Sequence, residues 1–189
     1  MRLLFVVIFL RFLHINITEN KIRGWIYMTE DKKQTIKTYI IAIAIPLIIG
    51  LLSTLLTKDK MDLYKDVTMP PLSPPSILFP IVWSILYILM GISSAIIWQN
   101  RKKDPSSANV GIVNYAISLI FNLGWSIIFF DLRQFLVAFI WLLVLLYFII
   151  RTIIAYKNIS RTAAYLQIPY VLWVAFAGYL NIGVWYLNM

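Results

Sequence analysis

The sequence contains five separate stretches of about twenty apolar residues each. At a rise of about 1.5 Å per residue, a helix of this length crosses a hydrocarbon core about 30 Å thick. Lipid offers the backbone no hydrogen-bond partners, so such spans fold as helices, and the uninterrupted runs do not alternate as barrel strands do. We therefore predict an all-α membrane protein, a bundle of five transmembrane helices embedded in the lipid bilayer. The spans lie near Tyr39–Thr57, Ile77–Trp98, Gly111–Phe130, Phe135–Ile154 and Tyr165–Leu187.

The start of the chain differs from the rest. Leu3–Leu13 is apolar but too short to span a membrane, and no small-residue cleavage site of a signal peptide follows it. It is either an interfacial helix or part of an upstream extension of a protein that begins at Met28, which is the interpretation we prefer. We predict an N-terminal extension and polar lead over residues 1–37 and a five-helix domain over residues 38–189.

The net charge of +9 comes from lysines and arginines placed mainly outside the apolar spans. In these positions basic residues orient a membrane protein, so lipid headgroups are the expected partners and nucleic acid is not. The richer set of connections is expected on the cytoplasmic side, which gives a cytoplasmic N-terminus and an external C-terminus. The richer set is Lys32, Lys33, Lys37, Arg101, Lys102, Lys103, Arg151, Lys157 and Arg161, against Lys58, Lys60, Lys65 and Arg133.

Residues that perform acid–base or metal chemistry are missing from the spans. The chain has no cysteine, its only histidine is His14, and all eight carboxylates lie in the tail or the loops. This excludes a buried carboxylate relay, a metal cluster and nucleophile systems that need histidine or cysteine. We expect no metal site, no resident cofactor and no conventional catalytic residue, and enzymatic activity stays open.

Tryptophans and amides occur at unusual depth. Trp83, Trp125 and Trp173 lie well inside their spans, whereas membrane tryptophans usually lie at the water interface. Each belongs to a row of residues at helical spacing, which places the row on one helix face. These faces either pack against one another or line a ligand pocket. The rows are Pro80, Trp83, Tyr87, Gly91 and Ser94; Asn114, Ser118, Asn122 and Trp125; and Pro169, Trp173, Ala177, Asn181 and Trp185.

Two further features lie at the start of the domain. The first span carries the small-residue row Ala42, Pro46, Gly50 and Thr54, which suits helix packing or a dimer face. The connection Met61–Ser76 contains four prolines in six residues, so it is stiff and serves as a lid or as a simple turn. As a lid, it would bring Tyr64 nearest to a ligand.

Three sequence blocks resemble the TspO/MBR family of tryptophan-rich sensory proteins and mitochondrial translocator proteins. They are Pro70-Pro71-Leu72-Ser73-Pro74-Pro75 with Phe79-Pro80-Ile81-Val82-Trp83, then Phe121-Asn122-Leu123-Gly124-Trp125, then Ile168-Pro169-Tyr170 through Trp173, Phe176 and Ala177 to Asn181. The resemblance covers about residues 39–187 in order.

The resemblance implies a five-helix bundle, commonly a homodimer, with a pocket beneath the first connecting loop. Members bind tetrapyrroles such as protoporphyrin IX, and animal members also bind cholesterol and benzodiazepine-type drugs. By position, Trp83 and Trp173 match pocket tryptophans and Tyr64 matches a lid tyrosine, while Asn122, Trp125, Phe176 and Ala177 match pocket-lining positions. Tyr87 and Asn181 join this candidate site because they share the same helix rows.

The chain also departs from the family pattern. Leu72 replaces a tryptophan in the proline-rich loop, and no basic residue follows Tyr179, as the sterol motif of animal members requires. Three functions remain open. The first is a tetrapyrrole-binding sensor or regulator of porphyrin or stress metabolism. The second is a light- and oxygen-dependent porphyrin-degrading enzyme, and the third is a facilitated carrier of porphyrin or lipid-like ligands.

Overall fold

The computed structural model describes residues 31–57 and 66–189 of the chain. Tyr64 and the predicted N-terminal extension up to Glu30 lie outside the described residues. The chain divides into two units, Met1–Thr38 and Tyr39–Met189. Of the first unit only Asp31–Thr38 is described, and it is helical. All packing reported below belongs to the second unit.

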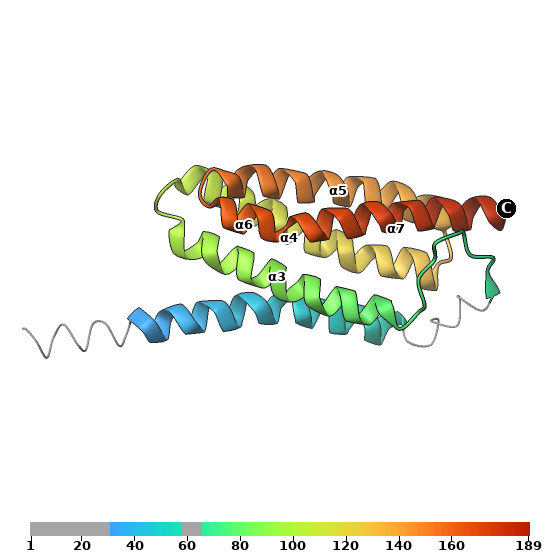
Figure 1. Cartoon of the computed structure of the whole chain (residues 1–189), viewed down its shortest axis with the longest axis horizontal. Coiled ribbons are helices and arrows are strands. Elements are labelled where there is room, and N and C mark those ends of the chain that lie inside the picture. The colour runs from blue at the N-terminus through green and yellow to red at the C-terminus, as the bar shows by residue number, and fades with distance from the viewer. Residues whose placement is uncertain (1–30, 58–65) are drawn as a thin grey trace, which may run out of the picture. The chain divides into compact units, whose positions relative to one another are not determined.

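Most of the described residues are helical and none lies in a strand, and they include five spans long and apolar enough to cross a membrane. This confirms the predicted all-α bundle of five transmembrane helices. The long helices of the second unit run alongside one another (Figure 1). The first span is the helix Asp31–Thr57. The others are α3 (Leu78–Asn100), α4 (Pro105–Ser126) with η2 (Ile127–Asp131), α5 (Phe135–Lys157), and α6 (Arg161–Leu166) with α7 (Ile168–Leu187).

Helix α4 begins six residues before the expected Gly111. The Asp104 side chain accepts a hydrogen bond from the Ser107 backbone N–H at 3.0 Å, and Pro105 occupies the first helical turn. Both are helix start signals. The aspartate accepts a hydrogen bond from a backbone N–H that has no partner within the helix, and at the first helical position the N–H that proline lacks would have no such partner either. The hydrogen bond from the Ser107 side chain, followed by that from its backbone, lowers the pKa of Asp104.

The C-terminal end of α4 changes into a π-helical turn, η2. The Leu132 N–H bonds to the Ile127 carbonyl at 3.0 Å, five residues back, and Phe129 and Phe130 are buried there. A π-turn places one more residue in the turn than an α-helix, and so changes which side chains face inward. The apolar pattern did not predict it.

The fifth span was expected as one helix from Tyr165, but it starts at Arg161 and breaks at Gln167. Pro169 has no N–H to donate, and its ring crowds the carbonyl of Tyr165 four residues earlier. On one side of the break, α6 packs on α3 through a hydrogen bond from the Ser93 hydroxyl to the Ala163 carbonyl at 2.7 Å. The break therefore divides the fifth span into α6 and α7.

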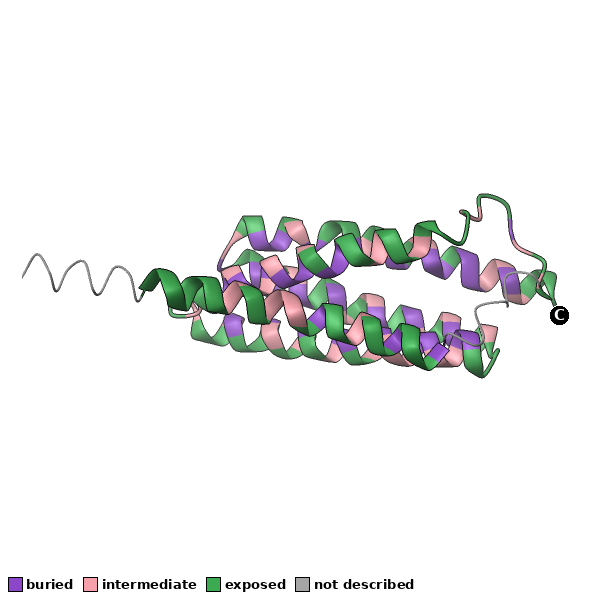
Figure 2. Ribbon diagram, turned by 90° about the horizontal axis from the view of Figure 1, so that it is seen from below, coloured by how far each residue is buried: buried purple, intermediate pink, exposed green. Residues whose placement is uncertain are grey.

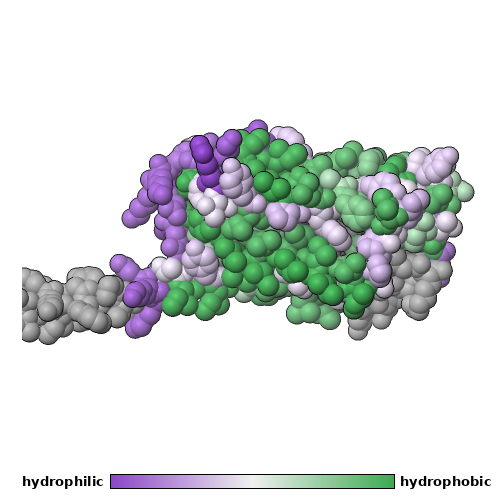
Figure 3. Space-filling view, in the orientation of Figure 1, coloured by the Kyte–Doolittle hydropathy of each residue, from purple (hydrophilic) through white to green (hydrophobic). Residues whose placement is uncertain are grey.

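Buried residues face the interior of the bundle, and exposed residues face outward along every helix (Figure 2). The outward faces are largely apolar, and the visible surface is hydrophobic over most of the helices (Figure 3). Small residues allow close helix contact at two points. A Cβ on Gly91 would lie 2.4 Å from the Ile43 Cα atom, and one on Gly111 would lie 2.6 Å from the Tyr156 ring.

The proline-rich segment is fastened to the C-terminal end of α7. The Asn188 side chain accepts a hydrogen bond from the Thr68 N–H at 2.9 Å and donates one to the Thr68 carbonyl at 3.0 Å. The Tyr179 hydroxyl donates to the Pro71 carbonyl at 2.8 Å. The next residue, Leu72, has a φ of 66°, in the left-handed region. These bonds hold the described part of the loop at one end of the bundle.

Candidate functional site

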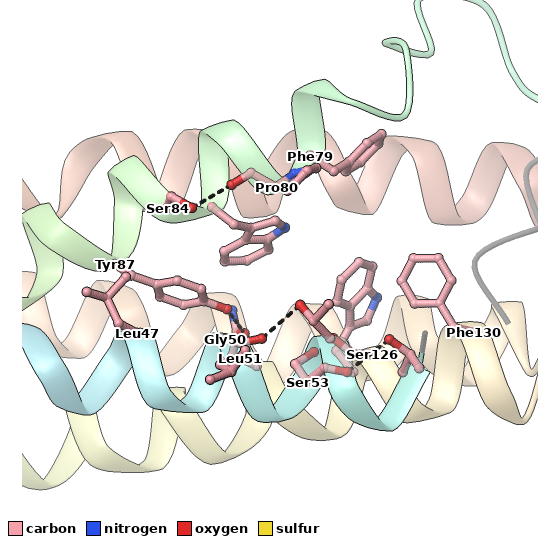
Figure 4. A pocket seen from close by; sticks show the side chains of 15 residues that line it. Leu47, Gly50, Leu51, Ser53, Phe79, Pro80, Ser84, Tyr87, Ser126 and Phe130 are labelled. Carbon is pink, nitrogen blue, oxygen red and sulfur yellow. Dashed lines mark hydrogen bonds between the residues drawn. The ribbon is translucent and has the colours of Figure 1, made fainter. Parts of the chain in front are cut away.

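A cavity of about 300 Å³ lies between the first helix, α3 and α4 with η2 (Figure 4). Aromatic rings and hydroxyl groups make up most of its wall. The lining residues are Leu47, Gly50, Leu51, Ser53, Thr54, Thr57, Phe79, Pro80, Trp83, Ser84, Tyr87, Asn122, Trp125, Ser126 and Phe130.

Trp83 is the centre of an aromatic cluster. Its indole stacks on the Tyr87 ring, with centroids 5.4 Å apart and an interplanar angle of 27°. It also lies 6.4 Å from the Trp125 ring and meets the Tyr170 ring edge to face at 6.1 Å. Contacts on several sides hold the indole in one orientation, so its exposed side is a preformed flat surface for a ligand.

Two buried asparagines hold these rings in place. The Tyr87 hydroxyl donates to Asn122 Oδ1 at 3.0 Å, and Asn122 Nδ2 donates to the Tyr170 hydroxyl at 3.2 Å. On the other side, Trp125 Nε1 donates to Asn181 Oδ1 at 3.1 Å. Both asparagines are 1% exposed, so their bonds form away from solvent. Three helices are thus joined around the cavity by side-chain hydrogen bonds.

The hydroxyl groups on the cavity wall already donate to their own helices. Thr54 donates to the Gly50 carbonyl at 3.0 Å, Thr57 to the Ser53 carbonyl at 2.9 Å, and Ser84 to the Pro80 carbonyl at 2.8 Å. Each oxygen keeps a lone pair that can accept a further bond. The first helix approaches closely at Gly50, where a Cβ would lie 2.2 Å from the Tyr87 ring.

None of the described residues that line this cavity carries a charge, and the polar groups that they offer are mainly acceptors. The arrangement suits a flat, largely apolar ligand with N–H groups that can donate to the hydroxyl oxygens. Among the described residues, no group of three or more histidines or carboxylates lies together.

The predicted site residues fall into separate groups. Trp83, Tyr87, Asn122 and Trp125 line the cavity. Asn181 lies behind Trp125 and donates through Nδ2 to the Ala177 carbonyl at 2.8 Å, so this pair supports the wall from α7.

Trp173 and Phe176 lie elsewhere, on an apolar groove of about 370 Å³ between α3 and α7. The Trp173 ring meets the Phe79 ring edge to face at 5.8 Å, and Phe79 lines the cavity. One phenyl ring therefore lies between Trp173 and the cavity.

Several wall residues were missed from the sequence. Tyr170 does not line the cavity itself but holds Trp83 and Asn122 in place. It was also missed, although it precedes Ala177 by seven residues and Asn181 by eleven, which places all three on one helix face. Phe130 lies in the π-turn, for which the sequence pattern gave no signal. Ser126 ends α4 and follows Asn122 by four residues, so its helix face could have been read from the spacing. The small-residue row of the first helix was expected to serve helix packing or a dimer face, and two of its members, Gly50 and Thr54, line the cavity.

Comparisons with known proteins agree with the sequence blocks and the bundle. The model of the TspO/MBR family matches residues 42–187. Tryptophan-rich protein TspO of Chlorobaculum tepidum is 39% identical over 137 residues, which are 72% of this chain and 85% of that protein. Protein CrtK of Rhodobacter capsulatus is 34% identical over 66% of this chain and 78% of its own length. The translocator protein of Ovis aries is 35% identical over 66% of this chain and 74% of its own length. The chain belongs to the TspO/MBR family.

Proposed function

We propose that this integral membrane protein binds a tetrapyrrole of the protoporphyrin IX type and acts as a sensor or regulator of porphyrin or stress metabolism. The observation that supports the proposal most is the fixed Trp83 indole, held by Tyr87, Trp125 and Tyr170 beside a cavity whose described lining residues are uncharged. A flat macrocycle would stack on this indole, and its pyrrole N–H groups would meet acceptor oxygens.

The size of the cavity sets a condition on this proposal. Small-ligand pockets range from about 300 to 1,000 Å³, and this one is at the lower end. A macrocycle therefore needs one wall to move outward. The first helix is the wall most suited to move, because its apolar window is the least buried of the five spans. The ligand's carboxylates would stay outside this cavity, toward the loops.

The proposal is tested by titrating the full chain in nanodiscs with protoporphyrin IX in darkness, following tryptophan fluorescence and the porphyrin absorbance band. Trp83→Phe should weaken binding by about threefold to tenfold, the usual value of one aromatic contact. Trp173→Phe should weaken it less, because Phe79 lies between Trp173 and the cavity.

Trp98→Phe is the matched control, since the Trp98 ring packs under the Arg101 guanidinium, away from the cavity. Equal loss in all three variants, or the absence of saturable quenching, would overturn the tetrapyrrole proposal. Illumination then separates the functions. Steady loss of the porphyrin band that Trp83→Phe abolishes would identify an enzyme, and porphyrin uptake into sealed vesicles would identify a carrier.

We also propose that the chain lies in a bacterial plasma membrane as a homodimer, with a cytoplasmic N-terminus and an external C-terminus. The basic Arg101–Lys103 segment and the Lys157–Arg161 segment lie at the same end of the bundle, as the bond from Asn158 Nδ2 to the Ser107 hydroxyl shows. The chain has no cysteine, so Lys103→Cys and Leu132→Cys give single labelling sites for the two ends. An impermeant thiol reagent should label only Leu132→Cys in intact cells, and light scattering in detergent should give the mass of a dimer.

A further inference from the structure

Arg151 is the only charged residue within the five apolar stretches of the sequence. It lies on α5, sixteen residues or about 24 Å after Phe135, in a membrane whose hydrocarbon core is about 30 Å thick. An ionised group at this depth is costly in lipid, so it needs a partner of opposite charge or a route to the headgroup level. Arginine reaches that level by extending its long side chain along the helix surface.

The protein itself does not supply the partner within the described residues. Among residues 31–57 and 66–189, none forms a hydrogen bond or an ion pair with the Arg151 guanidinium. Arg151 is exposed, and it follows the buried Ile149 by two residues, which is about 200° around the helix. The side chain therefore points away from the bundle interior, toward the lipid.

The outward face of α5 around Arg151 is apolar. Tyr147 lies one turn deeper on the same face and Ile154 lies one turn nearer to the helix end, and these residues are 55% and 57% exposed. The exposed apolar residues Leu143, Val144 and Ile150 continue this surface toward the middle of the span. A single cation thus lies above a surface that suits acyl chains.

The same helix face ends at Asn158, close to two basic connections. Asn158 Nδ2 donates to the Ser107 hydroxyl at 3.1 Å, which brings the α5–α6 connection next to the start of α4. Strongly hydrophilic residues gather at this end in Figure 3. The one carboxylate of these two connections, Asp104, already accepts the Ser107 N–H. The basic residues of the two connections are Arg101, Lys102, Lys103, Lys157 and Arg161.

An anionic phospholipid has the chemistry that this surface lacks. A guanidinium donates two parallel hydrogen bonds to a phosphate, and the excess of cations favours a headgroup with a net negative charge. A second copy of the chain fits less well. A two-fold contact on this face would bring two Arg151 side chains together, and no carboxylate lies on the described face to separate them.

We propose that the outward face of α5 binds one anionic phospholipid of the phosphatidylglycerol type. Its phosphate binds the Arg151 guanidinium, and an acyl chain lies along Tyr147 and Val144 toward the middle of the span. None of these three residues lines the cavity beside Trp83. The site needs no tetrapyrrole, so the failure of either proposal leaves the other one standing.

The test is native mass spectrometry of the full chain in detergent, offered equal amounts of phosphatidylglycerol and phosphatidylcholine with the same acyl chains. The unmodified chain should retain one phosphatidylglycerol in preference to phosphatidylcholine. Arg151→Gln should lower this preference about fivefold, the usual value of one basic side chain at a membrane surface. Arg151→Lys keeps the charge but loses the two parallel hydrogen bonds, so its preference should lie between the two.

Arg133→Gln is the matched control, because it removes the same charge at the other end of α5. Arg133 is already paired with Asp66 at 3.1 Å, so its loss should leave the lipid preference unchanged. Equal retention of the two lipids by the unmodified chain would overturn the proposal. The same loss of preference in Arg151→Gln and Arg133→Gln would also overturn it, because net charge alone would then explain the binding.

The mass spectra also test the second copy as the occupant. If Arg151→Gln changes the fraction of dimer and leaves the lipid preference unchanged, this face is a subunit interface and the lipid site is rejected. Arg151 has no described partner in the fold, so we expect the variant to melt at the temperature of the unmodified chain. Should it fail to fold, the lipid preference of Arg151→Lys against that of Arg133→Lys decides, and only the first should be lowered.

Discussion

Trp125 on α4 and Asn181 on α7 are joined by a hydrogen bond of 3.1 Å from the indole Nε1 to the amide Oδ1. Trp125 and Asn181 are 5% and 1% exposed, so water from outside the bundle cannot take the place of either hydrogen-bond partner. The indole that forms part of the cavity wall is therefore held in place from a helix that does not line the cavity itself.

Trp125→Phe should destabilise the protein because it leaves Asn181 Oδ1 without a donor. Buried hydrogen bonds between membrane helices contribute about 0.6 kcal/mol on average and up to about 1.7 kcal/mol. A double-mutant cycle with Asn181→Leu, measured by thermal unfolding in nanodiscs, isolates this coupling from the loss of ring area. Strictly additive effects of the two changes would show that the bond does not stabilise the fold.

Gly91→Ala should separate the first helix from α3. The new Cβ would lie 2.4 Å from the Ile43 Cα atom and 2.8 Å from the Ala42 carbonyl oxygen, and backbone atoms cannot yield as a flexible side chain does. We expect a loss of about 1 to 3 kcal/mol, typical of overpacking. Gly178→Ala is the control, because its Cβ would meet only the Phe139 ring at 3.8 Å. Similar melting temperatures for both variants would contradict the close approach.

Leu72→Gly should stabilise the protein. Leu72 has a φ of 66° and its side chain is 82% exposed, so glycine removes backbone strain of about 1 kcal/mol and loses no packing. Leu132→Gly, at a φ of −81° in another exposed loop, should instead lower stability slightly. A melting temperature above that of the unmodified chain for Leu72→Gly and below it for Leu132→Gly would confirm the backbone strain at Leu72. A lower melting temperature for both variants would refute it.

Stability should fall in acid partly through Asp104. Its pKa is lowered in the folded protein, chiefly by the hydrogen bond from the Ser107 side chain. The stabilisation is therefore fully present above the ordinary aspartate pKa of about 3.9 and is lost as the pH falls through the lower folded value. Asp104→Asn keeps an acceptor for the helix but not the charge. The melting temperature of this variant should depend less on pH between pH 5 and pH 2 than that of the unmodified chain. An unchanged dependence would show that other groups cause the loss of stability in acid.

The sequence predicted the number and type of the helices, because length and apolar content alone determine which segments can span lipid. Helix ends were less accurate. The Asp104-Pro105 start signal lies before the apolar run, and the break at Gln167 depends on how Pro169 meets a neighbouring turn.

The candidate site was predicted in part for a geometric reason. Rows at intervals of four advance by about 40° per step on a helix of 3.6 residues per turn. Over a short row such as Trp83 and Tyr87 the drift is small, and both residues line the cavity. From Trp173 to Asn181 it reaches about 80°, so the first lies on the outer groove and the second in the interior. The π-turn places Phe130 on the cavity wall, and the apolar pattern does not predict this turn.

The first helix makes two close contacts with α3, Gly91 on Ile43 and Gly50 on Tyr87. They are seven residues apart on the first helix and four apart on α3, and the cavity lies beside the second of them. Past Gly50 the helix continues for two turns along the cavity wall to Thr57. Such a helix can tilt about its glycine contacts as a lever does about a pivot. The volume available to a ligand would then change continuously with a rigid-body rotation, without breaking a single backbone hydrogen bond inside the bilayer.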